Sequence, residues 1–169
     1  MRRAGSELID AGRAGETYRV LPMTHDDLDA VLEIEHAAYA FPWSRGNFID
    51  SLSAGHPAQL LCNGQSGPLG YLVAMPGVDE LHLLNLTVAP AVQGRGHGRY
   101  LLSLVVDLCR RHAAHHVWLE VRQSNHRAQF IYAQFGFHAV GIRKGYYPAP
   151  HGQRENAVVM SLSIAPEPI

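Results

Sequence analysis

The spacing of apolar and polar positions predicts one strand and two helices at the start of the chain. Segment 17–23 has the composition of a strand. Thr24 stands before three polar residues and is a suitable helix N-cap, and Leu28, Val31, Leu32 and Glu35 then recur at the spacing of one helix face. After a break at 41–43, Ser44 can cap a second helix that extends to Leu52.

Three strands are predicted next. Segments 58–62 and 69–75 are strand-like and are separated by the turn-rich stretch 63–67, which predicts a hairpin. Segment 80–88 is a further apolar strand, and it ends before Pro90 because proline lacks the N–H group that a strand ladder needs.

The second half of the chain alternates helices and strands. A long helix is predicted after Gly98, up to the histidine-rich stretch 112–116, because its apolar residues repeat at the spacing of one buried face. Segment 117–121 is a strand that is apolar on both faces. Ser124-Asn125 can cap a helix that Gly136 would end, and strands 137–142 and 157–162 follow, joined by a Tyr/Pro/Gly-rich connector at 145–156.

The resulting order, β-α-α-β-β-β-α-β-α-β-β, predicts an α/β fold (α+β, with a mixed sheet) whose sheet is flanked by helices. Residues 1–16 form a polar, Gly/Ala-rich extension without periodicity, which is typical of a flexible end. We expect one domain at 17–163 and a short C-terminal tail at 164–169.

Composition narrows the class of protein. The chain has 169 residues, of which 47% are hydrophobic and 17% charged, and this fits one globular domain. The formal net charge of −1 and the lack of a basic run argue against direct nucleic-acid binding. Neither a secretory signal nor an apolar run of membrane-spanning length is present, and two cysteines cannot form a disulfide framework, so we expect a cytoplasmic protein without a membrane role. His112 and His116 have i, i+4 spacing, but no carboxylate or thiol accompanies them, and we expect no metal.

The segment Gln93-Gly94-Arg95-Gly96-His97-Gly98 lies between a predicted strand and a predicted helix start. Backbone N–H groups and the positive end of a helix dipole can hold an anion there, and glycines let the backbone approach a pyrophosphate closely. The spacing differs from both the Rossmann and the Walker motifs. A flexible turn is the alternative, although Arg95 and Arg99 could add charge-assisted contacts to a phosphate.

Val88-Ala89-Pro90, followed by Gln93-x-x-Gly96-x-Gly98, resembles the signature of the GCN5-related N-acetyltransferases (GNAT), in which this loop binds the pyrophosphate of coenzyme A. Other segments are similar to the RimI family within that superfamily, which acetylates the N-terminal alanine of a small-subunit ribosomal protein: Phe41-Pro42-Trp43-Ser44, Leu119-Glu120-Val121-Arg122, Ser124-Asn125, Ile131-Tyr132, Phe135-Gly136-Phe137 and Tyr146-Tyr147-Pro148. The resemblance covers residues 17–163.

The resemblance implies a GNAT-type acyl-CoA N-acyltransferase fold with a mostly antiparallel mixed sheet. It also implies acetyl-CoA as cosubstrate, the N-terminus of a ribosomal protein as acceptor, and direct attack of the amine through a tetrahedral intermediate. An acetyltransferase for another amine (lysine, a polyamine or an aminoglycoside) and a non-catalytic coenzyme A-binding module are the alternatives, because acceptor choice does not follow from fold.

Glu120 and Tyr132 are the candidate catalytic residues. Glu120 interrupts an apolar strand, where a carboxylate is rarely buried without a partner or a function, and an ion pair with Arg122 or Arg143 would explain it equally well. The resemblance implies that it is the base and acts through water. Tyr132 lies on an apolar helix face and fits core packing, whereas the resemblance implies that it protonates the coenzyme A sulfur.

The candidate cofactor-binding residues have simple structural roles as well. Asn125 is a helix cap, which the resemblance implies also contacts acetyl-CoA. Strand residues 86–88 fit core packing, but the resemblance implies that their backbone binds the pantetheine arm, with Val88 N–H as an oxyanion donor. The full set is Leu86, Thr87, Val88, Gly94, Arg95, Gly96, His97, Gly98, Arg99 and Asn125.

Four aromatic residues in predicted connectors could line the groove for the acceptor or could pack under loops: Phe41, Trp43, Tyr146 and Tyr147. The acidic residues Glu35, Asp79 and Glu80 could complement a basic peptide.

Overall fold

The computed structural model describes residues 7–9, 17–64 and 66–166. The chain divides into two compact units. Unit 1 comprises residues 1–74 and 85–101, and unit 2 comprises residues 75–84 and 102–169.

Unit 1 is built on antiparallel strands. Strand β2 (Tyr18–Pro22) pairs with β3 (Ala58–Asn63), and β3 pairs with β4 (Pro68–Pro76), which confirms the predicted hairpin. The strand order is β1-β2-β3-β4-β5, and the second half of β5 (Glu80–Val88) belongs to this unit.

Strand β1 (Glu7–Ile9) lies inside the N-terminal extension. It pairs antiparallel with β2, so the prediction of an extension without regular structure is wrong for these three residues. The remaining residues of 1–16 lie outside the described residues. An extended segment can pair with the free backbone groups of an edge strand whatever its side-chain pattern, which is why periodicity gave no signal here.

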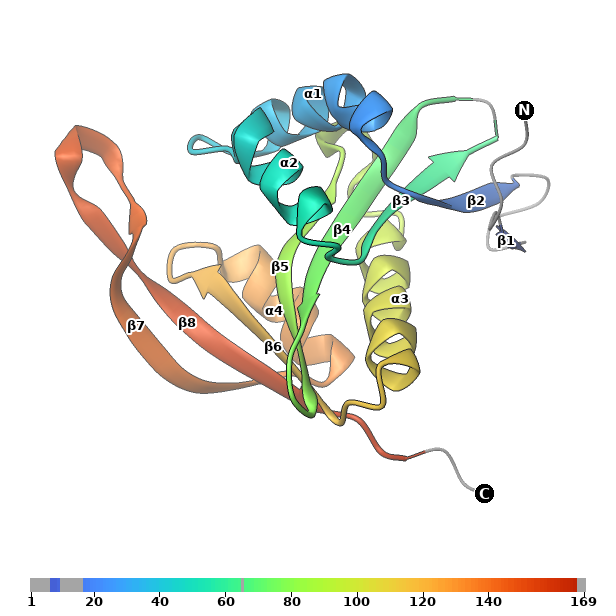
Figure 1. Ribbon diagram of the computed structural model, residues 1–169. Coiled ribbons are helices and arrows are strands. Elements are labelled where there is room, and N and C mark those ends of the chain that lie inside the picture. The colour runs from blue at the N-terminus through green and yellow to red at the C-terminus, as the bar shows by residue number, and fades with distance from the viewer. Residues whose placement is uncertain (1–6, 10–16, 65, 167–169) are drawn as a thin grey trace. The chain divides into compact units, whose positions relative to one another are not determined.

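Two helices follow β2 in unit 1, and Figure 1 shows them next to each other. A single 3-10 turn, η1 (His25–Asp27), leads into α1 (Leu28–Ala38), and α2 (Arg45–Ser53) comes after the loop. The cap predicted at Ser44 is confirmed, because Ser44 Oγ accepts from Asn47 N–H (3.1 Å). Thr24 precedes η1 instead of α1, and its N–H donates to Asp27 Oδ2 (2.7 Å). The core of this unit includes the fully buried Leu28, Val31, Phe48, Leu60, Leu61 and Tyr71.

Unit 2 contains the one parallel pair among the described strand registers. Residues Glu80–Leu83 of β5 pair in parallel with β6 (His116–Arg122), and β6 pairs antiparallel with β8 (Arg154–Ser163). Strand β7 (His138–Pro148) completes the order β5-β6-β8-β7. The predicted mixed, mostly antiparallel sheet is therefore confirmed.

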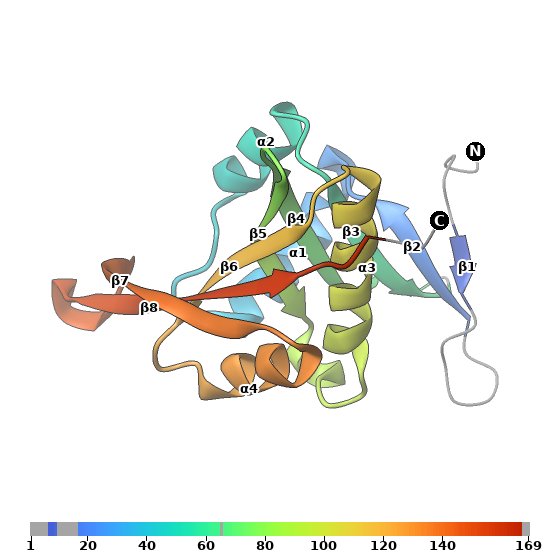
Figure 2. The ribbon, with the colours of Figure 1, turned by 90° about the horizontal axis from the view of Figure 1, so that it is seen from below.

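Helix α3 (His97–Arg111) follows β5 in the chain, and helix α4 (His126–Phe135) follows β6. Within unit 2, α4 lies on one face of β6, β7 and β8 (Figure 2). Helix α3 begins at His97, slightly earlier than predicted, and ends at Arg111. Since His116 belongs to β6, the two histidines at 112 and 116 do not share a helix face, and the i, i+4 premise of a metal pair is wrong.

The hairpin of β7 and β8 is longer than predicted (Figure 1). Strand β7 continues to Pro148 and β8 begins at Arg154, so Tyr146 and Tyr147 lie in a strand, and a connector over 145–156 was wrong. A shift in the β7–β8 register between Arg143 and Tyr147 accommodates Gly145, whose φ is +58°. This bulge lets the strand pass through residues that, as sequence, are typical of turns. The 3-10 turn η3 (Pro150–Gly152) closes the hairpin.

No helix in residues 7–9, 17–64 and 66–166 is long and apolar enough to cross a bilayer.

Candidate active site

The glycine-rich loop of unit 1 joins the end of β5 to the start of α3. Gly94 and Gly96 have φ values of +78° and +90°, which residues with a Cβ atom rarely adopt, so glycine is strongly favoured at both positions. The Gln93 side chain donates to Val88 O (3.1 Å) and ties the loop to β5. Because Tyr100 N–H donates to Gly96 O (3.1 Å), the N–H groups just before Tyr100 belong to the first turn, where helical partners are lacking. The loop is thus suited to binding an anion.

The basic side chains of this loop differ in burial. Arg95 and Arg99 are exposed, so both guanidinium groups are accessible to a phosphate. His97 is buried, and its ring meets Tyr18 edge to face at 5.5 Å. The His97 imidazole is therefore largely enclosed, and its predicted role in cofactor binding stays a prediction.

The second half of β5 carries the predicted pantetheine-binding residues. Thr87 is buried, and its Oγ1 donates to Asn85 Oδ1 (2.8 Å) and lies 2.8 Å from the Tyr39 hydroxyl. Tyr39 also donates to Leu86 O (3.3 Å). Burial raises the pKa of Tyr39 to about 12, so this phenol stays protonated at neutral pH. Strand β4 lies very close to this part of β5 at Gly70: a Cβ atom added to Gly70 would lie 2.6 Å from Thr87 O.

A buried carboxylate lies beside this segment in unit 1. Glu35 is 1% exposed, and it accepts hydrogen bonds from Trp43 N–H (2.9 Å), Asn85 Nδ2 (3.1 Å) and the Tyr71 hydroxyl. Burial, and then the charge of Glu35, raise the pKa of Tyr71 far above its usual value. The suggestion that Glu35 complements a basic peptide is wrong, because its carboxylate is fully enclosed. Its place on the apolar face of α1 was the sequence signal for this burial.

In unit 2, Glu120 on β6 has two basic partners. Its Oε2 lies 2.5 Å from His82 Nε2, and its Oε1 lies 3.3 Å from Arg143 Nε; the Glu120 side chain is 7% exposed. Of the two predicted ion pairs, the one with Arg143 is confirmed. Arg122 pairs instead with Glu155.

Sequence reasoning missed His82. His82 on β5 stands opposite Trp118 in the parallel register with β6. Trp118 precedes Glu120 by two residues on the same strand. A histidine that interrupts an apolar strand was the available signal, but only the strand neighbourhood could assign its partner.

Opposing effects act on the Glu120 carboxyl. Burial alone would raise its pKa, but the hydrogen bond from His82 and the charges of His82 and Arg143 outweigh burial, and the net pKa lies below the usual value. Glu120 is therefore ionised at neutral pH. It is an acceptor for hydrogen bonds and a weak base.

Helix α4 carries the other two predicted residues of unit 2. Asn125 Oδ1 accepts from Ala128 N–H (3.1 Å), which confirms the helix cap. Tyr132 is half-buried, and its ring centroid lies 5.7 Å from that of Phe137. Because the Tyr132 side chain is partly exposed, it is not confined to packing in the core.

The aromatic residues proposed for an acceptor groove have different surroundings. In unit 1, Trp43 packs at 5.1 Å from Phe48, whereas Phe41 is exposed. In unit 2, Tyr146 and Tyr147 meet edge to face at 4.8 Å. Each tyrosine has an arginine over its ring: the Arg143 guanidinium lies 5.5 Å from Tyr146, and that of Arg122 lies 4.5 Å from Tyr147.

Within the described part of the chain, no group of three or more His, Cys, Asp or Glu side chains could hold a metal ion. Cys62 and Cys109 are both buried, and burial raises the pKa of the Cys109 thiol, so neither resembles an activated nucleophile.

Comparison with known proteins places these features in context. The model of the acetyltransferase (GNAT) family matches residues 28–137. The [ribosomal protein bS18]-alanine N-acetyltransferase of Haemophilus ducreyi is 38% identical over 140 residues, which is 83% of this chain and 96% of that protein. The Escherichia coli enzyme of the same name is 37% identical over 140 residues (82% and 93%). The crystal structure of the ribosomal-protein-S18-alanine N-acetyltransferase from Escherichia coli superposes with a TM-score of 0.79 at 33% identity, covering 90% of this chain and 98% of that one.

Proposed function

The chain belongs to the acetyltransferase (GNAT) family, and from this membership we propose that it transfers the acetyl group of acetyl-CoA to the N-terminal α-amine of a protein, with the N-terminal alanine of ribosomal protein bS18 as acceptor. The observation that carries this acceptor is the similarity to bS18-alanine N-acetyltransferases at 37–38% identity over more than nine-tenths of their length.

Unit 1 supplies the proposed binding site for the donor. The backbone N–H groups of the loop at Gly94, Gly96 and Gly98 would bind the diphosphate, together with the guanidinium groups of Arg95 and Arg99. When bound, acetyl-CoA supplies an activated acetyl thioester. The backbone of Leu86–Val88, in the last part of β5, would bind the pantetheine arm. Val88 N–H would donate to the developing oxyanion.

Unit 2 supplies the proposed acid–base residues. Glu120, held ionised by His82 and Arg143, would accept a proton from the attacking amine through a water molecule. A weak base is sufficient for an α-amine: with a reference pKa near 8, on the order of 10% of such amines are neutral at pH 7, compared with about 0.04% of lysine side chains. The low pKa of Glu120 therefore suits an N-terminal acceptor better than a lysine.

Tyr132 would donate the proton that the departing thiolate needs, and Asn125, besides capping α4, would contact acetyl-CoA. Both cysteines are buried, which supports direct attack by the amine instead of transfer through an acetyl-cysteine.

The test is a thiol-release assay with acetyl-CoA and three classes of acceptor: peptides with the free N-terminus of bS18, N-terminally blocked peptides that contain lysine, and small polyamines. We expect turnover with the free alanine N-terminus and little with the other two classes. A preference for lysine peptides or polyamines would overturn the proposed acceptor and would still support acetyltransferase activity. Binding of acetyl-CoA without turnover on any acceptor would favour a non-catalytic module.

A further inference from the structure

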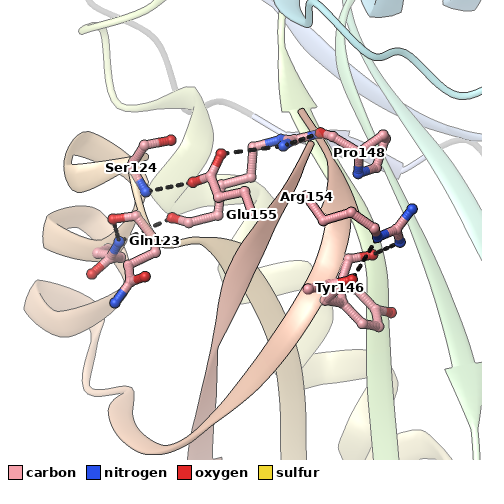
Figure 3. Close-up of polar contacts among 9 residues, drawn as sticks. Gln123, Ser124, Tyr146, Pro148, Arg154 and Glu155 are labelled. Atoms are coloured by element: carbon pink, nitrogen blue, oxygen red, sulfur yellow. Dashed lines mark hydrogen bonds and ion pairs between the residues drawn. The ribbon is translucent and has the colours of Figure 1, made fainter. Parts of the chain in front are cut away.

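The carboxylate of Glu155 joins the β7–β8 hairpin to the loop before α4. Glu155 is the second residue of β8 and stands opposite Tyr147 in the β7–β8 register. Its Oε2 accepts from Ser124 N–H (2.7 Å), and its Oε1 lies 3.3 Å from Arg122 Nη1. Figure 3 shows the carboxylate pointing away from the hairpin towards Ser124. Hydrogen bonding from Ser124, followed by Arg122, lowers the pKa of Glu155, so the carboxylate is charged at neutral pH.

Arg122, the ion-pair partner of Glu155, also contacts the C-terminal end of β7. Arg122 Nη1 also donates to Pro148 O (2.8 Å), and its guanidinium lies over the Tyr147 ring. Tyr147 in turn meets Tyr146, whose ring lies under Arg143, the partner of Glu120. A continuous set of contacts therefore runs from Glu155 through the tyrosine pair to the proposed catalytic carboxylate.

The two sides that Glu155 joins are anchored unequally. The loop before α4 has other supports, because Asn125 caps the helix and the Gln129 side chain donates to Arg122 O (3.0 Å) and Gln123 O (2.9 Å). Strand β7 is exposed along most of its length and interrupted by the bulge at Gly145, and its further side-chain supports here come from within the hairpin: Arg154 donates to Gly145 O (2.6 Å) and Tyr146 O (2.8 Å), and Gly145 N–H donates to Asn156 Oδ1 (3.0 Å). Loss of the Glu155 contacts would therefore loosen the end of the hairpin relative to the loop before α4, which keeps its own supports.

We propose that Glu155 is a positioning residue for the acceptor: together with Arg122 it fixes Tyr146 and Tyr147 so that they bind the acceptor peptide, without itself touching the reacting atoms. The inference rests on the proposed function and deepens it. A purely structural ion pair would affect stability, or both substrates alike. A positioning role affects the acceptor selectively.

The kinetic test compares Glu155→Gln with Asp107→Asn. Both changes replace a carboxylate of unit 2 by an amide, and Asp107 forms an exposed pair with Arg110 (3.7 Å) outside the proposed site. With the acceptor that the wild-type protein uses, we expect Glu155→Gln to raise the acceptor KM roughly 3- to 10-fold, because a charge-assisted but partly solvated contact is lost. The KM for acetyl-CoA should change less than about twofold, and Asp107→Asn should match wild type.

Arg122→Lys provides the second variant. It keeps the positive charge but loses the planar group that lies over Tyr147 and reaches Pro148 O and Glu155 together. The same selective rise in acceptor KM is expected. An equal rise of both KM values, or wild-type kinetics in Glu155→Gln, would overturn the proposal.

Hydrogen exchange tests whether Glu155 fixes the β7–β8 hairpin, independently of enzyme activity. In Glu155→Gln, the amides of residues 145–147 and 149 should exchange faster than in wild type and in Asp107→Asn, while α4 should stay protected. Unchanged exchange at these amides would overturn the inference even if the enzyme were active. A wild-type protein that acetylated no acceptor would instead refute the proposed function, and the exchange result would still decide whether Glu155 fixes the hairpin.

Discussion

His82 Nε2 lies 2.5 Å from Glu120 Oε2, across the parallel pair of β5 and β6. This contact and the ion pair with Arg143 lower the pKa of Glu120 although the side chain is almost fully buried. The proposed base is thus a carboxylate that is ionised at neutral pH and whose basicity is lowered by two neighbours. The predictions below follow from this arrangement and from the other contacts of the two units.

The pH dependence of acetyl transfer should follow the acceptor and not Glu120. The folded-state pKa of Glu120 is lowered, so its carboxyl group is ionised at every pH above the usual pKa of a glutamate. The negative charge is lost only when the pH falls through the lowered pKa. kcat/KM for a peptide should therefore rise about tenfold per pH unit up to the pKa of its amine, near 8. Profiles with two peptides that differ in the pKa of the N-terminal amine test this. A profile that stays fixed would point to a titrating group of the protein.

Glu120→Gln should lower turnover by roughly 10²-fold or more, because the amide cannot accept a proton. The affinity for acetyl-CoA should change little, since Glu120 is not among the proposed donor-binding residues and the loop proposed for the diphosphate lies in unit 1. Steady-state kinetics and direct titration of acetyl-CoA measure the two effects. Near-normal turnover would mean that Glu120 only partners His82 and Arg143.

Tyr132→Phe removes one hydroxyl and retains the ring that packs against Phe137. If the phenol protonates the leaving thiolate, kcat should fall by roughly 10²-fold, measured by steady-state kinetics on a variant whose thermal unfolding shows that it is folded. Equal turnover in the two proteins would leave Tyr132 as a packing residue.

Gly96→Ala tests the anion-binding loop. No atom lies within 4 Å of an added Cβ, but φ is +90°, so the substitution introduces backbone strain without a steric clash. Strain of about 1–2 kcal/mol should displace the loop amides and raise the Kd for acetyl-CoA roughly tenfold, measured by calorimetry. Gly67→Ala is the matched control, since Gly67 has equal space and no left-handed φ. A similar Kd in both variants would argue against the loop as the diphosphate site.

Glu35→Ala should destabilise the fold strongly. Three donors, on Trp43, Tyr71 and Asn85, would lose their buried acceptor, and each orphaned group is unfavourable. We expect the free energy of unfolding to fall by about 3 kcal/mol or more, measured by chemical denaturation. Asp29→Ala, which removes an exposed carboxylate paired with Arg45, should leave it nearly unchanged. A small effect of Glu35→Ala would show that water replaces the carboxylate.

Local signals were sufficient to predict most elements. Ser44 and Asn125 cap helices in the structure as their side chains indicated, and the apolar spacing located the strands to within a few residues. These features depend on neighbours in sequence, where hydrogen-bonding and burial preferences act directly.

The site contacts were less predictable because they depend on register. Glu120 on β6 pairs with Arg143 on β7, which lies one strand beyond β8, and its contact with His82 spans 38 positions of the chain. Likewise, a bulge carries β7 through Gly145, so that residues typical of turns belong to a strand. Propensity describes single residues, whereas pairing and bulges are properties of two strands together.

The enclosure of both sulfur atoms has a practical consequence for anyone working with this enzyme. Cys62 is 7% exposed and Cys109 is fully buried, so a chromogenic disulfide reagent should react slowly with the native protein. Continuous photometry can then register free coenzyme against a low background. In strong denaturant the same reagent should titrate two thiols per chain. The ratio of thiols that react without denaturant to those that react with it then measures the unfolded fraction of a variant preparation.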